Sequence, residues 1–379
     1  MRARRPFFSL ALEYSLALPL GAVLALVWAN TFDVSYYRFA HALDFSVNDV
    51  GMAFFFAIAA KEVVEATAPG GALHTWRRAA LPVIAAIGGM VVPALCYMLY
   101  VRLANETGLL RGWAIPCGTD IAFSYLVAKA VFRRHPAIPF LLLLAIADDA
   151  LGLVVLAMFY PARELHLLIG ALLMAAALVG AFGLRRTRVV SPWPYVLVAG
   201  TLSWSALYAG GLHPALALVP IMPFLPRATR DAGVFVPAPP DAHDALSRFE
   251  RWWKLPVQVV LFLFGLANAG VPLHEYGTGT WAVLVALAAG KPIGIGAAVA
   301  LGVAAGLRLP ARFGWRDVIV VGCASGIGFT FALFFAKASF TQGSMLDETK
   351  IGALFSLASA ALAVLAAKLL RSGRFSAAV

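Results

Sequence analysis

Six charged side chains interrupt apolar stretches of this sequence, and their types suit the binding of a small cation or a proton. They are Glu62 and Glu65, Asp120 in WAIPCGTDIAFSYLV, Asp148 and Asp149 in FLLLLAIADDALGLVVLAMF, and Lys291 in VALAAGKPIGIGAAV. A charge within a membrane segment costs at least a few kcal/mol, so each of them is a functional candidate.

The neighbouring carboxylates Asp148 and Asp149 carry the strongest signal. Adjacent residues of a helix point about 100° apart, so the two cannot share one partner on one side. We expect one of them to face a hydrated ion cavity and the other to pair with Lys291. The alternative is a structural salt-bridge cluster. However, three aspartates with a single lysine leave surplus negative charge, which favours a mobile cation or protons.

Two segments are predicted to be interrupted helices. Asp120 follows Pro116, Gly118 and Thr119, and the second segment is GCASGIG at 322–328, which contains Gly322, Ser325 and Gly326. Paired interruptions in separated parts of a transporter indicate its ion site. Half-helix ends carry partial charges, so Asp120 could compensate the positive ends and Lys291 the negative ends. Ordinary glycine-mediated helix contacts are the alternative.

The elements that position these residues must lie in a bilayer. Of the 379 residues 61% are hydrophobic and 13% are charged, and the mean hydropathy is +0.84. A soluble core could not hide so much apolar surface. The net charge of +11 comes from Arg and Lys at the ends of apolar runs rather than from a continuous basic stripe, which argues against nucleic-acid binding.

The apolar segments predict an all-α polytopic membrane protein with about twelve transmembrane helices. They fall near 10–30, 50–68, 79–101, 113–132, 137–160, 165–184, 192–209, 211–225, 255–271, 281–304, 316–337 and 348–370. The first is interpreted as a retained helix, not a signal peptide. Basic residues concentrate in alternate loops, which places both termini in the cytoplasm. Residues 1–379 are expected to form one transmembrane domain with a cytoplasmic linker at about 226–253.

The motifs resemble those of the NhaA-type sodium/proton antiporter family over nearly the whole chain. They are WAIPCGTDIAFS, LLAIADDALGLVV, FGLANAGVPL, GKPIGI and VVGCASGIGFT, in that order. The resemblance implies twelve helices with inverted repeats, in which helices 4 and 11 are unwound and cross near mid-membrane. It also implies a transporter, not an enzyme. Such a transporter exchanges Na⁺ or Li⁺ for H⁺ by alternating access across the bacterial inner membrane, in pH homeostasis, without a cofactor.

Site roles follow from the same resemblance. Asp149 would be the principal ion-binding carboxylate, and Asp148 would join it as a ligand of Na⁺ or Li⁺ and pair alternately with Lys291. Asp120 and Thr119 would belong to the break in helix 4.

The chain also departs from the family in regions that the resemblance links to pH response. Glu62, Glu65 and Glu250 are the candidates for that response. The Lys-Arg pair of better-known members is replaced by Val63 and Val64, and Arg251 and Lys254 stand where histidines are expected. Solvated helix-end charges are the alternative for Glu62 and Glu65. A homodimer is compatible with the resemblance, but the first outer loop, about 31–49, is too short for the family's β-hairpin contact.

Two other function classes fit the sequence less well. An intramembrane aspartyl protease would need a GxGD-like motif, whereas this chain has GTD and ADD; a serine protease based on Ser325 would need a later histidine, and the last one is His274. A sodium-coupled symporter can share a related architecture. However, it need not keep a titratable aspartate pair opposite a buried lysine.

Overall fold

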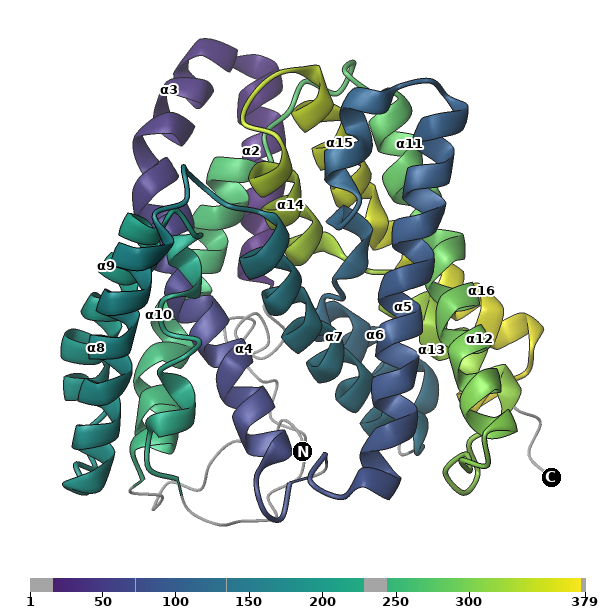
Figure 1. Cartoon of the computed structure of the whole chain (residues 1–379). Helices are drawn as coiled ribbons and strands as arrows, with labels where there is room; N and C mark the ends of the chain where they lie inside the picture. The colour runs from purple at the N-terminus through teal and green to yellow at the C-terminus, as the bar shows by residue number, and fades with distance from the viewer. Residues whose placement is uncertain (1–15, 72, 134, 228–243, 376–379) are drawn as a thin grey trace, which may run out of the picture. The chain divides into compact units, whose positions relative to one another are not determined.

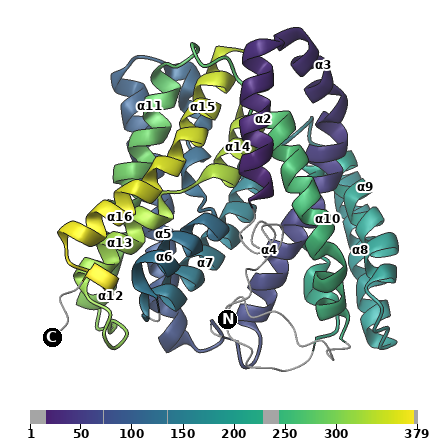
Figure 2. The same cartoon turned by 180° about the vertical axis from the view of Figure 1, so that it is seen from behind.

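The computed structural model describes residues 16–71, 73–133, 135–227 and 244–375. Every regular element in these ranges is helical, and none of the described residues lies in a strand (Figures 1 and 2). The predicted all-α class is therefore confirmed. The chain divides into two compact units, one formed by Met1–His74 and Leu153–Gly270 and the other by Thr75–Gly152 and Val271–Val379.

The first unit packs its long helices in pairs around a buried apolar cluster that includes Tyr195, Met222 and Phe249. Helix α2 lies along α10, and α8 lies along α9 (Figure 1). Its elements are α2 (Ala17–Thr31), α3 (Asp33–Asp44), η1 (Phe45–Gly51), α4 (Met52–Thr67), α8 (Leu167–Arg186), η4 (Tyr195–Gly200), α9 (Thr201–Gly210), η5 (Pro214–Leu216), η6 (Met222–Phe224) and α10 (Ala245–Asn268).

The second unit contains most of the charged residues singled out above. Its first elements are α5 (Trp76–Leu103), η2 (Thr107–Gly112), η3 (Ile115–Cys117), α6 (Ile121–Phe132) and α7 (Ala137–Phe159), the last of which extends beyond the unit boundary. The later elements are α11 (Thr278–Val285), η7 (Ala286–Gly290), α12 (Lys291–Ala304), α13 (Trp315–Ser325), α14 (Phe329–Ser339), α15 (Ser344–Phe355), η8 (Ser356–Ala358), α16 (Ser359–Leu369) and η9 (Gly373–Phe375).

Small residues bring α5 and α12 together in the second unit (Figure 2). A Cβ atom added to Gly88 would lie 2.4 Å from the carbonyl oxygen of Gly294, and one added to Gly294 would lie 2.2 Å from the carbonyl oxygen of Gly88. The two backbones therefore touch, as in the small-residue interfaces of membrane helices. This contact fixes α12, and with it Lys291 at the start of that helix.

The helices are long and apolar enough to cross a bilayer. Six described stretches qualify outright, and two bent helix pairs raise the number to as many as eight. The remaining predicted segments correspond to α2, of which fifteen residues are described, to α9, to α10 and to the turns at 214–224. Large apolar side chains face outward, such as Leu172 at 64% and Val179 at 71% exposure on α8. Such surface requires lipid around it.

One predicted helix is not a continuous α-helix. The segment expected at 211–225 consists of turns and two short 3₁₀ pieces, η5 and η6. Pro214, Pro220 and Pro223 remove backbone donors at close intervals, so an α-helical ladder cannot run through the segment. Its hydrophobic length is typical of a membrane span, but its prolines favour tight turns.

Several boundaries also differ from expectation. Helix α10 begins at Ala245, inside the linker expected at 226–253, because the Asp244 carboxylate caps it by accepting a hydrogen bond from the Ser247 N–H at 3.0 Å. The first loop, about 31–49, contains α3, and the helix expected at 50–68 continues it through η1. Residues 10–15 of the first predicted helix and 228–243 of the linker lie outside the described residues.

Candidate ion-binding site

Two helices of the second unit are broken at the expected places. The stretch Thr107–Cys117 is bent by 54° relative to Ile121–Phe132, and Trp315–Ser325 is bent by 49° relative to Phe329–Ser339. Residues 118–120 and 326–328 form the short non-helical breaks. The prediction of two interrupted helices is confirmed.

The two breaks lie against each other. The N–H of Asp120 donates to the carbonyl oxygen of Ile327 at 2.6 Å, and the Ser124 hydroxyl donates to the carbonyl oxygen of Ala324 at 2.8 Å. The second bond reaches a carbonyl group in the last turn of α13, where helical partners run out, and the first reaches a carbonyl group in the break itself. A Cβ atom on Gly118 would lie 2.3 Å from the Cβ atom of Phe331, so the close approach requires glycine there.

The Asp120 carboxylate serves the N-termini of two helices. One oxygen accepts from the N–H of Phe123 in the first turn of α6, at 3.3 Å. The other accepts from the N–H of Thr330 at 3.4 Å and from its hydroxyl, at the start of α14. The positive ends of two half-helices therefore converge on one carboxylate, as the position of Asp120 beside the break led us to expect.

Lys291, Asp148 and Thr119 form a compact buried group. The Lys291 Nζ atom lies 2.6 Å from Asp148 Oδ2 and 2.5 Å from the Thr119 hydroxyl oxygen. That hydroxyl lies 2.6 Å from the same Asp148 oxygen and 3.2 Å from the Ser325 carbonyl oxygen. A hydroxyl has one proton, so it donates to only one of these acceptors at a time. The side chain of Lys291 is fully buried, and that of Asp148 is 1% exposed.

Each of the two aspartates has a buried oxygen atom without a hydrogen-bond partner among the described residues. These atoms are Oδ1 of Asp148 and Oδ1 of Asp149. Asp149 is 3% exposed and lies within electrostatic reach of Asp120, Asp148 and Lys291. Buried polar atoms are nearly always satisfied in folded proteins, so two adjacent unsatisfied carboxylate oxygens indicate a place for a ligand or a proton.

Gly322, Ser325 and Gly326, the residues singled out around the second break, each have a different structural role. Gly322 allows α13 to approach α12, since a Cβ atom there would lie 2.7 Å from Cα of Pro292. The Ser325 hydroxyl donates back to the carbonyl oxygen of Val321 at 3.0 Å. Gly326 follows the last residue of α13. In addition, the hydroxyls of Thr119 and Ser124 contact the last carbonyl groups of α13, and no hydrogen bond joins these carbonyls to Lys291 among the described residues.

The glutamates considered for pH response gather around a lysine in the first unit. Lys61 Nζ lies 3.2 Å from Glu62 Oε1, 2.7 Å from Glu65 Oε2 and 2.9 Å from Glu250 Oε2. The side chain of Lys61 is 2% exposed and that of Glu65 is 38% exposed. The cluster therefore carries three carboxylates with one ammonium group, and it is more than a set of solvated helix ends.

Sequence reasoning missed the parts played by Lys61, Ser124 and Thr330. Lys61 could have been found, because it stands four residues before Glu65, the spacing of a helical ion pair. Thr330 ends the motif GCASGIGFT, but nothing local shows that its hydroxyl reaches Asp120 from another helix. Ser124 likewise bonds a carbonyl group far away in the chain.

Known proteins are similar to this chain over most of its length. Residues 7–370 match the family model described as Na⁺/H⁺ antiporter 1. The Na⁺/H⁺ antiporter NhaA of Geotalea uraniireducens is 45% identical over 367 residues, which cover 94% of this chain and 95% of the relative. The protein of the same name from Geobacter metallireducens is 42% identical over 381 residues, covering 98% of this chain and 99% of the relative.

Proposed function

The chain belongs to the Na⁺/H⁺ antiporter 1 family, and on this basis we propose that Asp148 and Asp149 bind the transported cation and exchange it for protons. As a member of this family the chain is a transporter and not an enzyme, and it needs no cofactor because the ions are its substrates. The protease and symporter hypotheses are not favoured.

One observation supports this assignment above all. The Oδ1 atoms of Asp148 and Asp149 are buried without a partner among the described residues, beside the crossing of two broken helices. Carboxylate oxygens are the ligands that hard cations such as Na⁺ prefer. The same oxygens accept protons, so a cation and a proton compete for one place and exchange does not require both to be bound at once.

Lys291 and Thr119 set the electrostatics of the proposed site. In the arrangement described, Asp148 Oδ2 is taken by the ammonium group and by the hydroxyl. An ion bound at Asp148 Oδ1 shares that carboxylate with Lys291, so the two cations repel each other and the ion weakens the contact of Lys291 with Oδ2. Asp120 keeps the helix ends in place around the aspartates through its bonds to Phe123 and Thr330.

The wider physiological role follows from the family and from the charge pattern. We expect Na⁺ and Li⁺ to be exchanged for H⁺ by alternating access, in pH homeostasis at a bacterial inner membrane, with both termini in the cytoplasm. The cluster of Lys61 with Glu62, Glu65 and Glu250 is the candidate for a pH response. A homodimer, if formed, would not use a β-hairpin at 31–49, where the structure places α3 and part of η1.

Transport in inverted membrane vesicles tests the proposed function. A pH-sensitive dye reports the internal acid pH set up by respiration, and Na⁺, Li⁺ or K⁺ is then added. We expect Na⁺ and Li⁺ to dissipate the pH gradient and vesicles that lack the protein to show no response. Failure of both ions across the range from pH 6 to 9 would contradict the proposal.

A further inference from the structure

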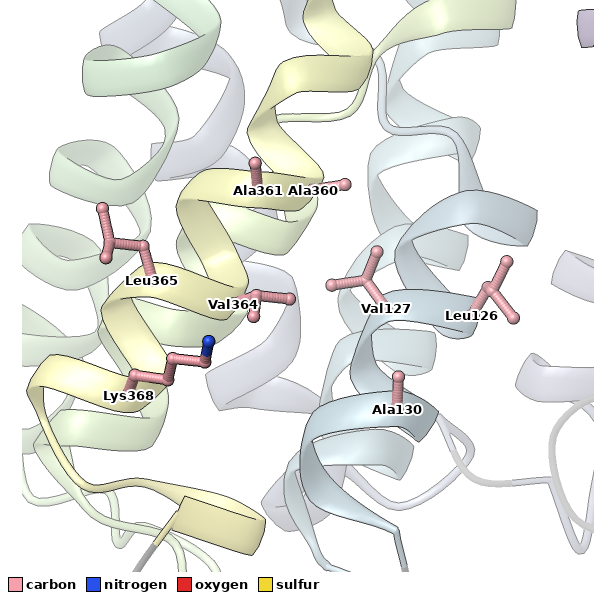
Figure 3. Close-up of a pocket in the computed structure, with 8 residues that line it drawn as sticks. All are labelled: Leu126, Val127, Ala130, Ala360, Ala361, Val364, Leu365 and Lys368. Carbon is pink, nitrogen blue, oxygen red and sulfur yellow. The ribbon is translucent and has the colours of Figure 1, made fainter.

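A groove in the second unit remains unused by ion exchange. It has a volume of about 460 Å³ and lies between α6 and α16. Leu126, Val127 and Ala130 line it from α6, and Ala361, Val364 and Lys368 from α16 (Figure 3). The α16 surface beside it is apolar and exposed, with Leu365 at 52% and Leu369 at 74%. An occupant of the groove must therefore be largely apolar, and it must be able to enter the groove from the membrane.

The groove has a cationic end. In Figure 3 the side chain of Lys368 extends along α16 toward Val364, so its ammonium group lies next to the apolar lining. Lys368 Nζ lies 5.8 Å from the ring centre of Phe375, and the guanidinium carbon of Arg374 lies 4.6 Å from the same centre. Two cations thus gather around one aromatic ring. Neither forms an ion pair with any carboxylate of the described residues.

A second, polar cavity continues from this point. Its volume is about 390 Å³, and Phe132, Arg133, His135, Arg374 and Phe375 line it. Asp317 is an acid close to this lining, and its Oδ2 atom lies 3.9 Å from His135 Nε2. That carboxylate already accepts hydrogen bonds from the Ser372 hydroxyl and from the N–H of Gly314, so it is engaged elsewhere. Arg133 and Arg374 are left facing the cavity with Lys368 close by.

We propose that these two adjoining spaces bind an anionic phospholipid. One acyl chain lies in the groove between α6 and α16, and the phosphate group lies at Lys368, Arg374 and Arg133. The order of an apolar space followed by uncompensated basic side chains at a helix end matches the order of tail and headgroup in such a lipid. A zwitterionic lipid offers the same tail but no net negative charge, so it fits less well. The lipid joins α16 to α6, the helix that Asp120 caps.

Thermal unfolding of the purified full chain in detergent tests this proposal. Dioleoyl phosphatidylglycerol and dioleoyl phosphatidylcholine, which have the same chains, are titrated separately. We expect the anionic lipid to raise the unfolding temperature at a lower half-saturating concentration than the zwitterionic lipid. Lys368→Gln and Arg374→Gln should each raise that concentration about fivefold for the anionic lipid. This factor corresponds to the binding free energy that one basic side chain contributes near an anionic membrane surface. Both variants should change the response to the zwitterionic lipid less, because its choline group already offsets the charge of its phosphate.

Three controls distinguish binding at this site from non-specific electrostatic attraction between the lipid and the basic protein. Lys254→Gln removes an exposed lysine of α10, outside the groove, and should change nothing. Val364→Phe fills the groove and should weaken both lipids; if it fails to fold, the exposed charge variants still decide. Glycerol 3-phosphate has the charge without the chains and should not stabilise the protein. Three results would overturn the proposal. The first is an equal effect of both lipids, and the second is a preference for the anionic lipid that persists in the double variant Lys368→Gln, Arg374→Gln. The third is full stabilisation by glycerol 3-phosphate.

Discussion

At the scale of single residues, Asp149 offers the sharpest test of the ion site. Its side chain is buried, and its Oδ1 atom has no partner among the described residues. Asp149→Asn keeps the shape but can neither release a proton nor supply a full negative charge. We expect cation-dependent proton movement in vesicles to fall to the background of vesicles without the protein, with unchanged amounts of protein in the membrane. Normal exchange by this variant would remove Asp149 from the mechanism.

Lys291 tests the buried ion pair. Breaking such a pair by removing one partner costs about 3–5 kcal/mol while the other stays charged. Lys291→Ala leaves Asp148 buried with only the Thr119 hydroxyl as a donor, so we expect a lower unfolding temperature and an altered pH profile of exchange. The loss of stability should be greater at high pH, where Asp148 is ionised, than at low pH, where it can take up a proton.

Lys291→Arg provides the matched control, because it retains the positive charge. We expect it to be milder in both measurements. If the wild type and both variants share one unfolding temperature and one pH profile, the contact at 2.6 Å does not contribute in the membrane.

At the scale of elements, the crossing of the broken helices depends on Asp120. Its carboxylate bonds the N-terminal turns of α6 and α14. A hydrogen bond to a charged group contributes about 1.5–3 kcal/mol, and a charge at a helix N-terminus adds about 0.3–1 kcal/mol. We therefore expect Asp120→Ala to lower the unfolding temperature clearly. Asp120→Asn, which keeps an acceptor but loses the charge, should lower it less.

Thr330→Val distinguishes the contribution of the α14 end from that of the α6 end. It removes the hydroxyl that donates to Asp120 but keeps the backbone N–H and the bond to Phe123. Its effect should be smaller than that of Asp120→Ala. Equal unfolding temperatures for all these proteins would show that Asp120 does not hold the crossing together.

At the scale of the whole molecule, pH dependence distinguishes competition at the ion site from a separate gate. A proton on Asp148 or Asp149 removes the negative charge that Na⁺ needs, so apparent Na⁺ affinity should fall as pH falls. Because the two ions compete, saturating Na⁺ should restore the exchange rate. A full Na⁺ titration at each of several pH values measures both. Activity that stays off at low pH and saturating Na⁺ would require a gate elsewhere, for which the cluster around Lys61 is the candidate.

Much of this protein could be predicted from local features of its sequence. Hydropathy alone predicts helices in lipid, because within a bilayer every backbone group must find its partner inside its own segment or a closed barrel. Charges in apolar runs identify Asp120, Asp148, Asp149 and Lys291, since each carries a cost that needs a reason. Proline and glycine beside Asp120, and the glycines at 322–328, predict the two breaks. All of these signals lie within a few neighbouring residues.

Only the tertiary structure decided which of these groups meet. Asp148 and Asp149 are adjacent and chemically identical, and the structure brings Lys291 of α12 to Asp148 and not to Asp149 by a hydrogen bond. The bond from Thr330 to Asp120 joins residues 210 positions apart. Hydropathy likewise could not separate the prolyl turns at 214–224 from a helix, because it measures transfer to lipid and not backbone donors. The sequence by itself determined that Asp120, Asp148, Asp149 and Lys291 lie within membrane segments. The crossing of distant helices decided which of these charges meet, because Coulomb energies depend on distance in space.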